Sequence, residues 1–249
     1  MYELLSQPKN KNSDFCSSDT LPTEITQSDD FLEEAVFAGG GFWGLEAAFG
    51  CVDGVVKTAA GYCGGTLKKP TYREVSEGWT GHTEVVKVNY DKRKVSYKLL
   101  CKSFWESHDP TNKEYLGFGV DTHYRSAIFY ANEEQKKHAL QTKIEHQMKL
   151  NRRIVTKILP YSTDFFFLAE NQHQKYYLQK DYIWVCESLN LRSTQQFIDS
   201  SVACKLNGIL GRNDKMVVEN LKRFVDVCSL PGHTKKVLEE IVEDLEGKS

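Results

Sequence analysis

Short apolar runs alternate with helical patterns between residues 34 and 182, which is typical of an α/β or α+β domain. Side chains alternate over residues 82–90, where one face carries Val86, Val88 and Tyr90 and the other carries Val85, Lys87 and Asn89. This period of two predicts a strand with one face more buried than the other. Shorter strands are predicted over residues 35–38, 55–62 and 125–130.

Capping signals predict two helices in the same region. Ser96 is the predicted N-cap of a helix that ends before Pro110. Its apolar residues are Leu99, Leu100, Phe104 and Trp105. Asn132 is the predicted N-cap of a long charged helix that runs to about residue 150.

The composition changes after about residue 188, and three helical segments are predicted to follow one another. The last begins at His233, and the middle one is capped by Asp214; both repeat apolar residues at intervals of three and four. Such stripes are more often packing faces than partner-binding sites. We therefore divide the chain into a disordered polar leader (1–32), a main domain (33–188) and a helical C-terminal extension (189–249).

Composition limits the classes of binding partner and the cellular compartment that we expect for this chain. The formal net charge is −2 and no dense Lys/Arg block interleaves with aromatic residues, so neither nucleic acid nor a membrane surface is indicated. No window approaches the roughly 18 apolar residues of a membrane-spanning helix. Seven widely spaced cysteines without a C-x-x-C pair indicate thiols in a reducing compartment. We expect a cytoplasmic, or also nuclear, protein without a bound metal or cofactor.

Three consecutive glycines precede an aromatic pair in the stretch AGGGFWGLEAAFG, residues 38–50. A glycine cluster before a helix can cradle a phosphate, but this stretch lacks the G-K-[ST] ending of a P-loop. Six further motifs accompany it: GYCGG, KPTYREV, GHTEVVKVNYD, SFWESHDPT, THYRSAIFY and AENQHQKYYL. Together, over about residues 34–180, they resemble the A-type peptide methionine-S-sulfoxide reductase family. The resemblance implies an α+β two-layer sandwich with a mixed sheet.

The family's signature at the glycine stretch is G-C-F-W-G, and its cysteine is the nucleophile that attacks the sulfoxide sulfur. In this chain Gly41 stands at the position of that cysteine. The reaction needs a thiolate at a helix N-terminus, where the helix dipole and unsatisfied N–H groups lower the thiol pKa. Glycine has no sulfur, so no sulfenic acid intermediate would form.

The resemblance implies further roles position by position. Glu84 matches the acid that protonates the sulfoxide oxygen, which requires a pKa raised by burial; an outward carboxylate is the alternative. Tyr72 and Tyr124 match the tyrosines whose hydroxyls hold that oxygen, and ordinary core tyrosines are the alternative. The segment Phe42-Trp43-Gly44 matches the surface that receives the S-methyl group, with helix packing as the alternative role.

Two further departures concern the loop before Tyr124 and the thiols. Gly119 stands where the family usually has an acid, Asp121 lies two residues late, and Tyr115-Leu116 replace an Arg-Gln pair, so we expect altered polarity in the substrate loop. Cys63 is the first candidate for a surrogate nucleophile, ahead of Cys51, and both also fit the pattern of ordinary buried thiols. The candidates for recycling thiols are Cys186, Cys204 and Cys228.

Two classes of function remain open. As an active family member, the protein would reduce methionine-S-sulfoxide in oxidised proteins, or free methionine sulfoxide, with thioredoxin as the reductant. As a non-catalytic descendant, a pseudoenzyme, it would bind methionine sulfoxide or methionine-containing segments through the same residues. A third possibility is that Gly41 has been introduced, because one base separates Gly and Cys codons.

Overall fold

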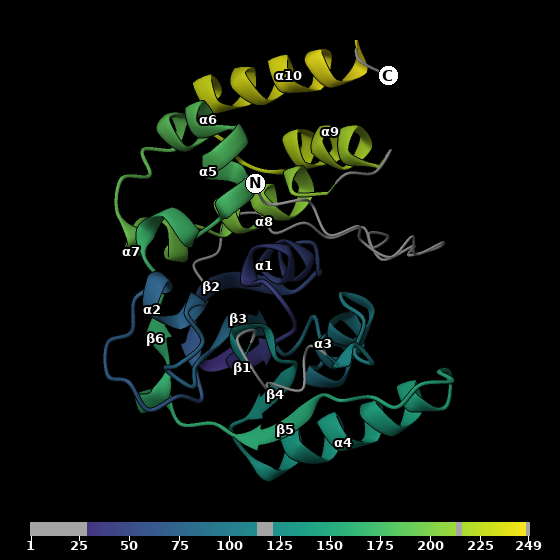
Figure 1. Cartoon of the computed structure of the whole chain (residues 1–249). Helices are drawn as coiled ribbons and strands as arrows, with labels where there is room; N and C mark the ends of the chain where they lie inside the picture. The colour runs from purple at the N-terminus through teal and green to yellow at the C-terminus, as the bar shows by residue number, and fades with distance from the viewer. Residues whose placement is uncertain (1–28, 114–121, 213–215, 248–249) are drawn as a thin grey trace.

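The computed structural model of the chain describes residues 29–113, 122–212 and 216–247 and has a six-stranded sheet at its centre (Figure 1). The strands lie in the order β5-β4-β1-β3-β2-β6. Their bounds are β1 Leu32–Ala38, β2 Val55–Cys63, β3 Thr83–Asp91, β4 Ala127–Tyr130, β5 Lys157–Pro160 and β6 Phe167–Leu168. Neighbouring strands run antiparallel except β4 and β5, which are parallel. The mixed sheet confirms the predicted fold class.

The helices of the main domain are α1 Phe42–Gly50, α2 Tyr72–Ser76, α3 Tyr97–Glu106 and α4 Glu133–Gln147. Both predicted caps are confirmed. Ser96 accepts a hydrogen bond from the Leu99 N–H, and Asn132 accepts one from the Gln135 N–H. Helix α4 ends before the predicted residue 150. Elements as short as α2, β5 and β6 carry too little periodic pattern to be predicted.

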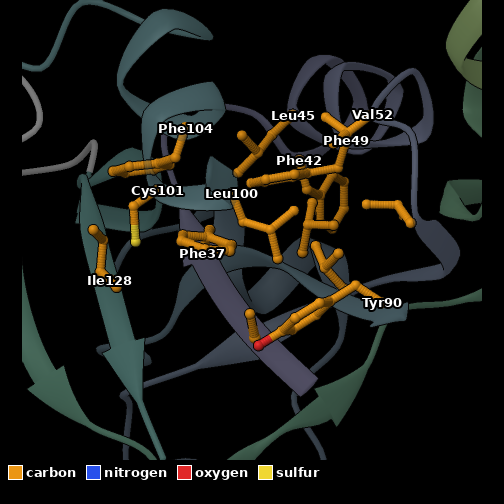
Figure 2. Packing of buried hydrophobic residues seen from close by; sticks show 14 of the residues in the cluster. Phe37, Phe42, Leu45, Phe49, Val52, Tyr90, Leu100, Cys101, Phe104 and Ile128 are labelled. Carbon is orange, nitrogen blue, oxygen red and sulfur yellow. The ribbon is translucent and has the colours of Figure 1, made fainter. Parts of the chain in front are cut away.

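Aromatic side chains fill the space between the helices and one face of the sheet. Phe42, Leu45 and Phe49 project from α1 into a cluster that contains Phe37 of β1 (Figure 2). The ring centroids of Phe37 and Phe49 lie 4.8 Å apart, and those of Phe37 and Phe104 lie 5.3 Å apart. This packing against the sheet, with the helices as the second layer, confirms the predicted two-layer sandwich.

Strand β3 has the two faces that its sequence predicts. Its helix-covered face carries the fully buried Val86, Val88 and Tyr90, whereas Lys87 and Asn89 are half-buried. Val85 departs from this pattern because it is buried in a smaller cluster on the opposite face of the sheet. Since side chains alternate along a strand, Glu84 shares the helix-covered face with Val86.

Six α-helices follow β6 in the described part of the chain. Their bounds are α5 Tyr176–Asp181, α6 Ile183–Ser188, α7 Thr194–Asp199, α8 Ser201–Leu210, α9 Val217–Val227 and α10 Gly232–Glu246. Four of them come after residue 188, so the prediction of three was wrong. The reason is Ser200, whose extended backbone ends α7 and whose side chain accepts from the Ala203 N–H to begin α8. The predicted cap Asp214 lies outside the described residues.

The C-terminal helices stack on the side of α1 that faces away from the sheet (Figure 1). Helix α8 approaches α1 closely: a Cβ atom on Gly208 would lie only 2.7 Å from the backbone carbon of Gly50 and from the Cys51 nitrogen. The core of these helices includes Leu178 and Val185. This packing therefore begins before residue 189, and the predicted domain boundary stays a prediction.

Within the described ranges, no helix has both the length and the apolar character needed to span a bilayer.

Candidate functional site

The site is centred on the turn that joins β1 to α1. Gly40 has a φ of 78°, in the left-handed region that favours glycine, and its N–H donates to the Tyr124 carbonyl at 3.3 Å. Gly41 takes the N-cap position of α1 and is exposed. Apart from chain neighbours, the nearest described atoms to a Cβ at Gly41 would be Oε2 of Glu84 at 3.8 Å and Cε1 of Tyr124 at 3.9 Å. The turn therefore has room for a β-carbon.

Glu84 lies at the start of β3, next to the N-terminus of α1. Its Oε2 accepts a hydrogen bond from the Phe42 N–H at 2.9 Å, and the residue is 2% exposed. Burial raises the pKa of Glu84 to about 8, although the bond from Phe42 acts in the opposite direction. The carboxyl group is therefore mostly protonated at neutral pH, which is the state that a proton donor requires.

A second carboxyl group, that of Glu170, positions two tyrosines. Its Oε2 accepts from the Tyr62 hydroxyl and its Oε1 accepts from the Tyr72 N–H, each at 2.8 Å. Burial by itself would raise the pKa of Glu170, but these hydrogen bonds prevail and the pKa lies below its usual value. The site therefore combines a neutral carboxyl group at Glu84 with an ionised one at Glu170.

Aromatic rings from three segments gather beside Gly41. The Trp43 ring stacks on Tyr176 with a centroid distance of 3.8 Å, and the Tyr72 ring lies 4.3 Å from the His173 ring. The Phe42 ring lies 6.1 Å from that of Tyr72. Trp43 and Tyr72 are only half-buried. Their open surfaces suit a methyl group or a polarizable sulfur atom.

Two buried nitrogens in this aromatic cluster have no hydrogen-bond partner among the described residues: Nδ1 of His173 and Nε1 of Trp43. His173 is 6% exposed, and burial lowers its pKa, so the ring is neutral at pH 7. Buried polar atoms are normally hydrogen-bonded. A water molecule or a polar ligand would satisfy the two nitrogens.

Tyr124 closes the other side of the glycine turn, at the end of the short 3-10 helix Thr122–Tyr124. Gly44 lies one turn into α1 and is exposed, with the Tyr177 hydroxyl 4.0 Å from the position of a Cβ. The structure thus brings Gly41, Phe42, Trp43, Glu84, Tyr72 and Tyr124 into one neighbourhood. The predicted loop departures at Tyr115, Leu116, Gly119 and Asp121 lie outside the described residues.

Cys63 is not brought to this neighbourhood. Cys63 in β2 pairs with Thr83 in β3, and the adjacent pair is Tyr62 with Glu84. Because side chains alternate along a strand, the Cys63 side chain points to the face of the sheet opposite to that of Glu84. There it is buried in the cluster that contains Val85. Burial raises the pKa of the Cys63 thiol to about 11. Both its position and its protonation state argue against a nucleophilic role.

The C-terminal cysteines lie in or against the helices that follow β6. Cys204 is buried at the far end of α1, where its carbonyl oxygen would lie 2.5 Å from a Cβ on Gly50, and α1 rises about 13 Å between its ends. Cys186 is buried in the C-terminal core, and burial raises its pKa to about 12. Cys228 is half-buried, with its pKa also raised by burial. Cys204 is thus separated from position 41 by the length of α1, and the role of Cys186 and Cys228 as recycling thiols stays a prediction.

A buried ion pair fixes α1 to the segment that carries Glu170 and His173. Lys175 Nζ lies 2.8 Å from Glu46 Oε1, both side chains are fully buried, and the Lys175 N–H donates to Glu46 Oε2. The Thr58 hydroxyl also donates to Glu46. These bonds compensate for the loss of water around the charges. They also hold the aromatic cluster against α1.

The motif AENQHQKYYL contributes to the resemblance, but its sequence predicts no role for Glu170, His173 or Tyr176. Their contacts join residues about a hundred positions apart, which no local pattern reveals. The sequence feature that could have pointed to these residues is the density of polar residues in a motif shared with the family. In the described part of the chain, no three His, Cys, Asp or Glu side chains are grouped to hold a metal ion.

Comparison with known proteins gives a consistent result. A family model described as peptide methionine sulfoxide reductase matches residues 33–206. The chain is 49% identical over 154 residues to the peptide methionine sulfoxide reductase MsrA of Methanosarcina acetivorans, covering 61% of this chain and 81% of that protein. It is 42% identical over 170 residues to MsrA of Pasteurella multocida, covering 68% of this chain and 95% of that protein.

Solved structures show the same relationship. Reduced Mxr1 from Saccharomyces cerevisiae matches with a TM-score of 0.55 and 30% identity, over 65% of this chain and 93% of that one. Methionine sulfoxide reductase A of Corynebacterium diphtheriae matches with a TM-score of 0.52 and 34% identity, over 61% of this chain and 76% of that one.

Proposed function

The chain belongs to the peptide methionine sulfoxide reductase family, and on this premise we propose that it binds methionine-S-sulfoxide but does not reduce it unaided. The observation that carries the proposal is the pairing of Gly41 with Glu84. A buried acid that is protonated at neutral pH lies 3.8 Å from the position of a Cβ at Gly41, yet that position has no thiol. The site keeps the proton donor and lacks the nucleophile.

Binding would use groups that are already in place. The Glu84 carboxyl would donate to the sulfoxide oxygen, with the hydroxyls of Tyr72 and Tyr124 as further donors. The S-methyl group would lie on the half-buried Trp43 ring beside Phe42. The ligand would be a methionine sulfoxide residue of an oxidised protein or the free amino acid, because Gly41 and Gly44 leave this side of α1 open to solvent.

Reduction by a resident thiol is the competing function, and the positions of the cysteines speak against it. Cys63 lies on the opposite face of the sheet, and Cys204 lies at the far end of α1. An active family member would form a sulfenic acid at position 41 and pass its oxidation to thioredoxin, the reductant that the resemblance implies. We propose that thioredoxin has no oxidised thiol to act on in this chain.

The test compares the chain with its Gly41→Cys and Gly41→Ser variants. We expect all three to bind a peptide that contains one methionine-S-sulfoxide, measured by calorimetry. Only Gly41→Cys should produce methionine, with dithiothreitol as the reductant. Gly41→Ser is the matched control because serine has the size of cysteine without its thiol. Methionine formation by the unmodified chain, or failure of every variant to bind the peptide, would contradict the proposal.

A further inference from the structure

Helix α4, which lies at the edge of the molecule, carries its largest apolar side chains on the face that points to solvent (Figure 1). The residues that α4 buries are small or polar: Gln135, Ala139 and Thr142. Leu140, Ile144 and Met148 are 45%, 63% and 84% exposed. Because they are four residues apart, these three lie on one side of the helix and form a continuous row, which we call the α4 stripe.

Hydrogen bonds on the buried side of α4 fix the direction in which the stripe points. The Gln135 side chain accepts from the Ala131 N–H and donates to the Glu34 carbonyl, each at 2.8 Å. The Lys143 ammonium group donates to the Thr156 carbonyl at 2.6 Å. A rotation of α4 that buried the stripe would break these bonds. Single exposed apolar residues are ordinary, but a row of three held outward is typical of an interaction surface.

The segment that carries the stripe is basic, although the whole chain is not. Residues 133–153 contain six Lys or Arg residues and three Glu, whereas the net charge of the chain is −2. Lys149, Arg152 and Arg153 follow the stripe and are exposed; Arg152 contacts Asp109 at 3.3 Å, and its side chain remains 75% exposed. Two of the three glutamates lie in the first turn, at the other end of α4, and the third is paired with a lysine of α3.

Charge and shape together select the class of partner. The apolar side chains project outward from a helix, so they suit insertion into a partner. A second copy of this surface would bring two segments of net positive charge together, which is unfavourable. The surface of a bilayer with anionic lipids offers an apolar environment for the three side chains and negative charge for the neighbouring cations.

We propose that the α4 stripe docks on the surface of a membrane that contains anionic lipids, with the cations at the end of α4 beside the lipid phosphates. The expectation that no membrane surface is a partner depended on the charge of the whole chain, which conceals the local excess in residues 133–153. Helix α4 carries none of the residues of the candidate site. Membrane docking is therefore independent of the proposed sulfoxide binding.

Co-sedimentation of the full chain with phosphatidylcholine vesicles, with and without phosphatidylserine, tests the inference. We expect binding only to the vesicles that contain phosphatidylserine. This binding should be lost when the salt concentration is raised from about 0.1 M to about 1 M, because the Debye length falls from about 10 Å to about 3 Å. Equal binding to both kinds of vesicle, or binding that salt does not change, would overturn the role of the cations.

Two substitutions separate the apolar part of the surface from the charged part. Ile144→Gln should lower the partition coefficient about tenfold, because a polar amide replaces an apolar side chain that enters the membrane surface. Lys149→Gln should lower it about fivefold, the fold-change that corresponds to about 1 kcal/mol for a Lys or Arg near an anionic surface.

The matched controls are Ile183→Gln in α6 and Lys235→Gln in α10. They make the same exchanges at exposed positions, on helices at the opposite end of the molecule from α4 (Figure 1). Both controls should bind the vesicles as the unmodified chain does. Equal losses in the controls and in the α4 variants would contradict a docking surface on α4. Thermal unfolding checks that each variant is folded, and exchanges at exposed positions should leave it unchanged.

A negative result with vesicles also decides the matter. If the chain binds neither kind of vesicle, the inference is wrong. Sedimentation equilibrium of the unmodified chain and of Ile144→Gln then shows whether the stripe joins two copies of the chain, because only the unmodified chain would self-associate. Calorimetric binding of the sulfoxide peptide should be the same in Ile144→Gln as in the unmodified chain, so failure of the proposed function is recognised separately.

Discussion

Sulfoxide binding should depend on pH through the proton on Glu84. The protonated carboxyl group donates a hydrogen bond to the sulfoxide oxygen, whereas the ionised carboxylate has no hydrogen to donate and repels that oxygen. The pKa of Glu84 is raised by burial to about 8. The dissociation constant should therefore be constant between about pH 6 and 7 and should increase above pH 8.

The magnitude follows from the protonated fraction. Each pH unit above the pKa lowers that fraction tenfold, so the dissociation constant should rise up to tenfold per unit, equal to about 1.4 kcal/mol. The shifted pKa values of neighbouring groups move away from pH 8. Burial lowers the pKa values of His82 and His173 and raises that of Tyr62, and Glu170 is ionised throughout. Glu84 alone of these groups changes charge near pH 8.

Calorimetric titration of the sulfoxide peptide from pH 6 to pH 10 tests this reasoning. In Glu84→Gln the amide still donates a hydrogen bond but cannot ionise, so the rise above pH 8 should disappear. Glu77→Gln, at an exposed glutamate, is the matched control and should keep the rise. A rise of the same size in Glu84→Gln, or a midpoint near the ordinary pKa of a glutamate, would refute the role of this proton.

Three further predictions concern stability and the excluded thiol. The folded pKa of Glu84 lies above its unfolded value, so its contribution to stability is full below about pH 4.5 and is lost as pH rises towards 8. In urea titrations the free energy of unfolding of Glu84→Gln should therefore fall less over this range than that of the unmodified chain. Glu46→Gln should lower the free energy of unfolding by about 3–5 kcal/mol in urea titrations, since it leaves the buried Lys175 charge uncompensated; a loss below about 1 kcal/mol would contradict this. Cys63→Ala should leave peptide binding unchanged within twofold, and a larger loss would return Cys63 to the site.

Local chemistry accounts for what could be predicted from the sequence. The alternation in β3 and the side-chain caps at Ser96 and Asn132 depend on residues only a few positions apart, and each is found where expected. The division of the chain near Ser200 was missed because one residue serves as the end of α7 and the cap of α8. A continuous helical pattern hides such a break.

The candidate site depends more on contacts between distant residues. Motif spacing placed Cys63 close to Tyr72 along the chain, but strand register turns its thiol to the opposite face of the sheet. Glu170 lies about a hundred residues after the two tyrosines that it positions. Its role follows from hydrogen bonds that only the folded chain reveals. The raised pKa of Glu84 likewise follows from burial and not from its neighbours in sequence.

The supports of the site explain how position 41 can lack a thiol while the geometry around it persists. Glu84 is held by the Phe42 N–H, Tyr72 by Glu170, and α1 by the Glu46–Lys175 pair, and none of these bonds involves a side chain at position 41. Glycine is also among the residues favoured at an N-cap, so it does not weaken the start of α1. The bonds that hold the site together are thus independent of a side chain at position 41, and the proposed sulfoxide binding requires none there. Only the chemical step requires sulfur at this point.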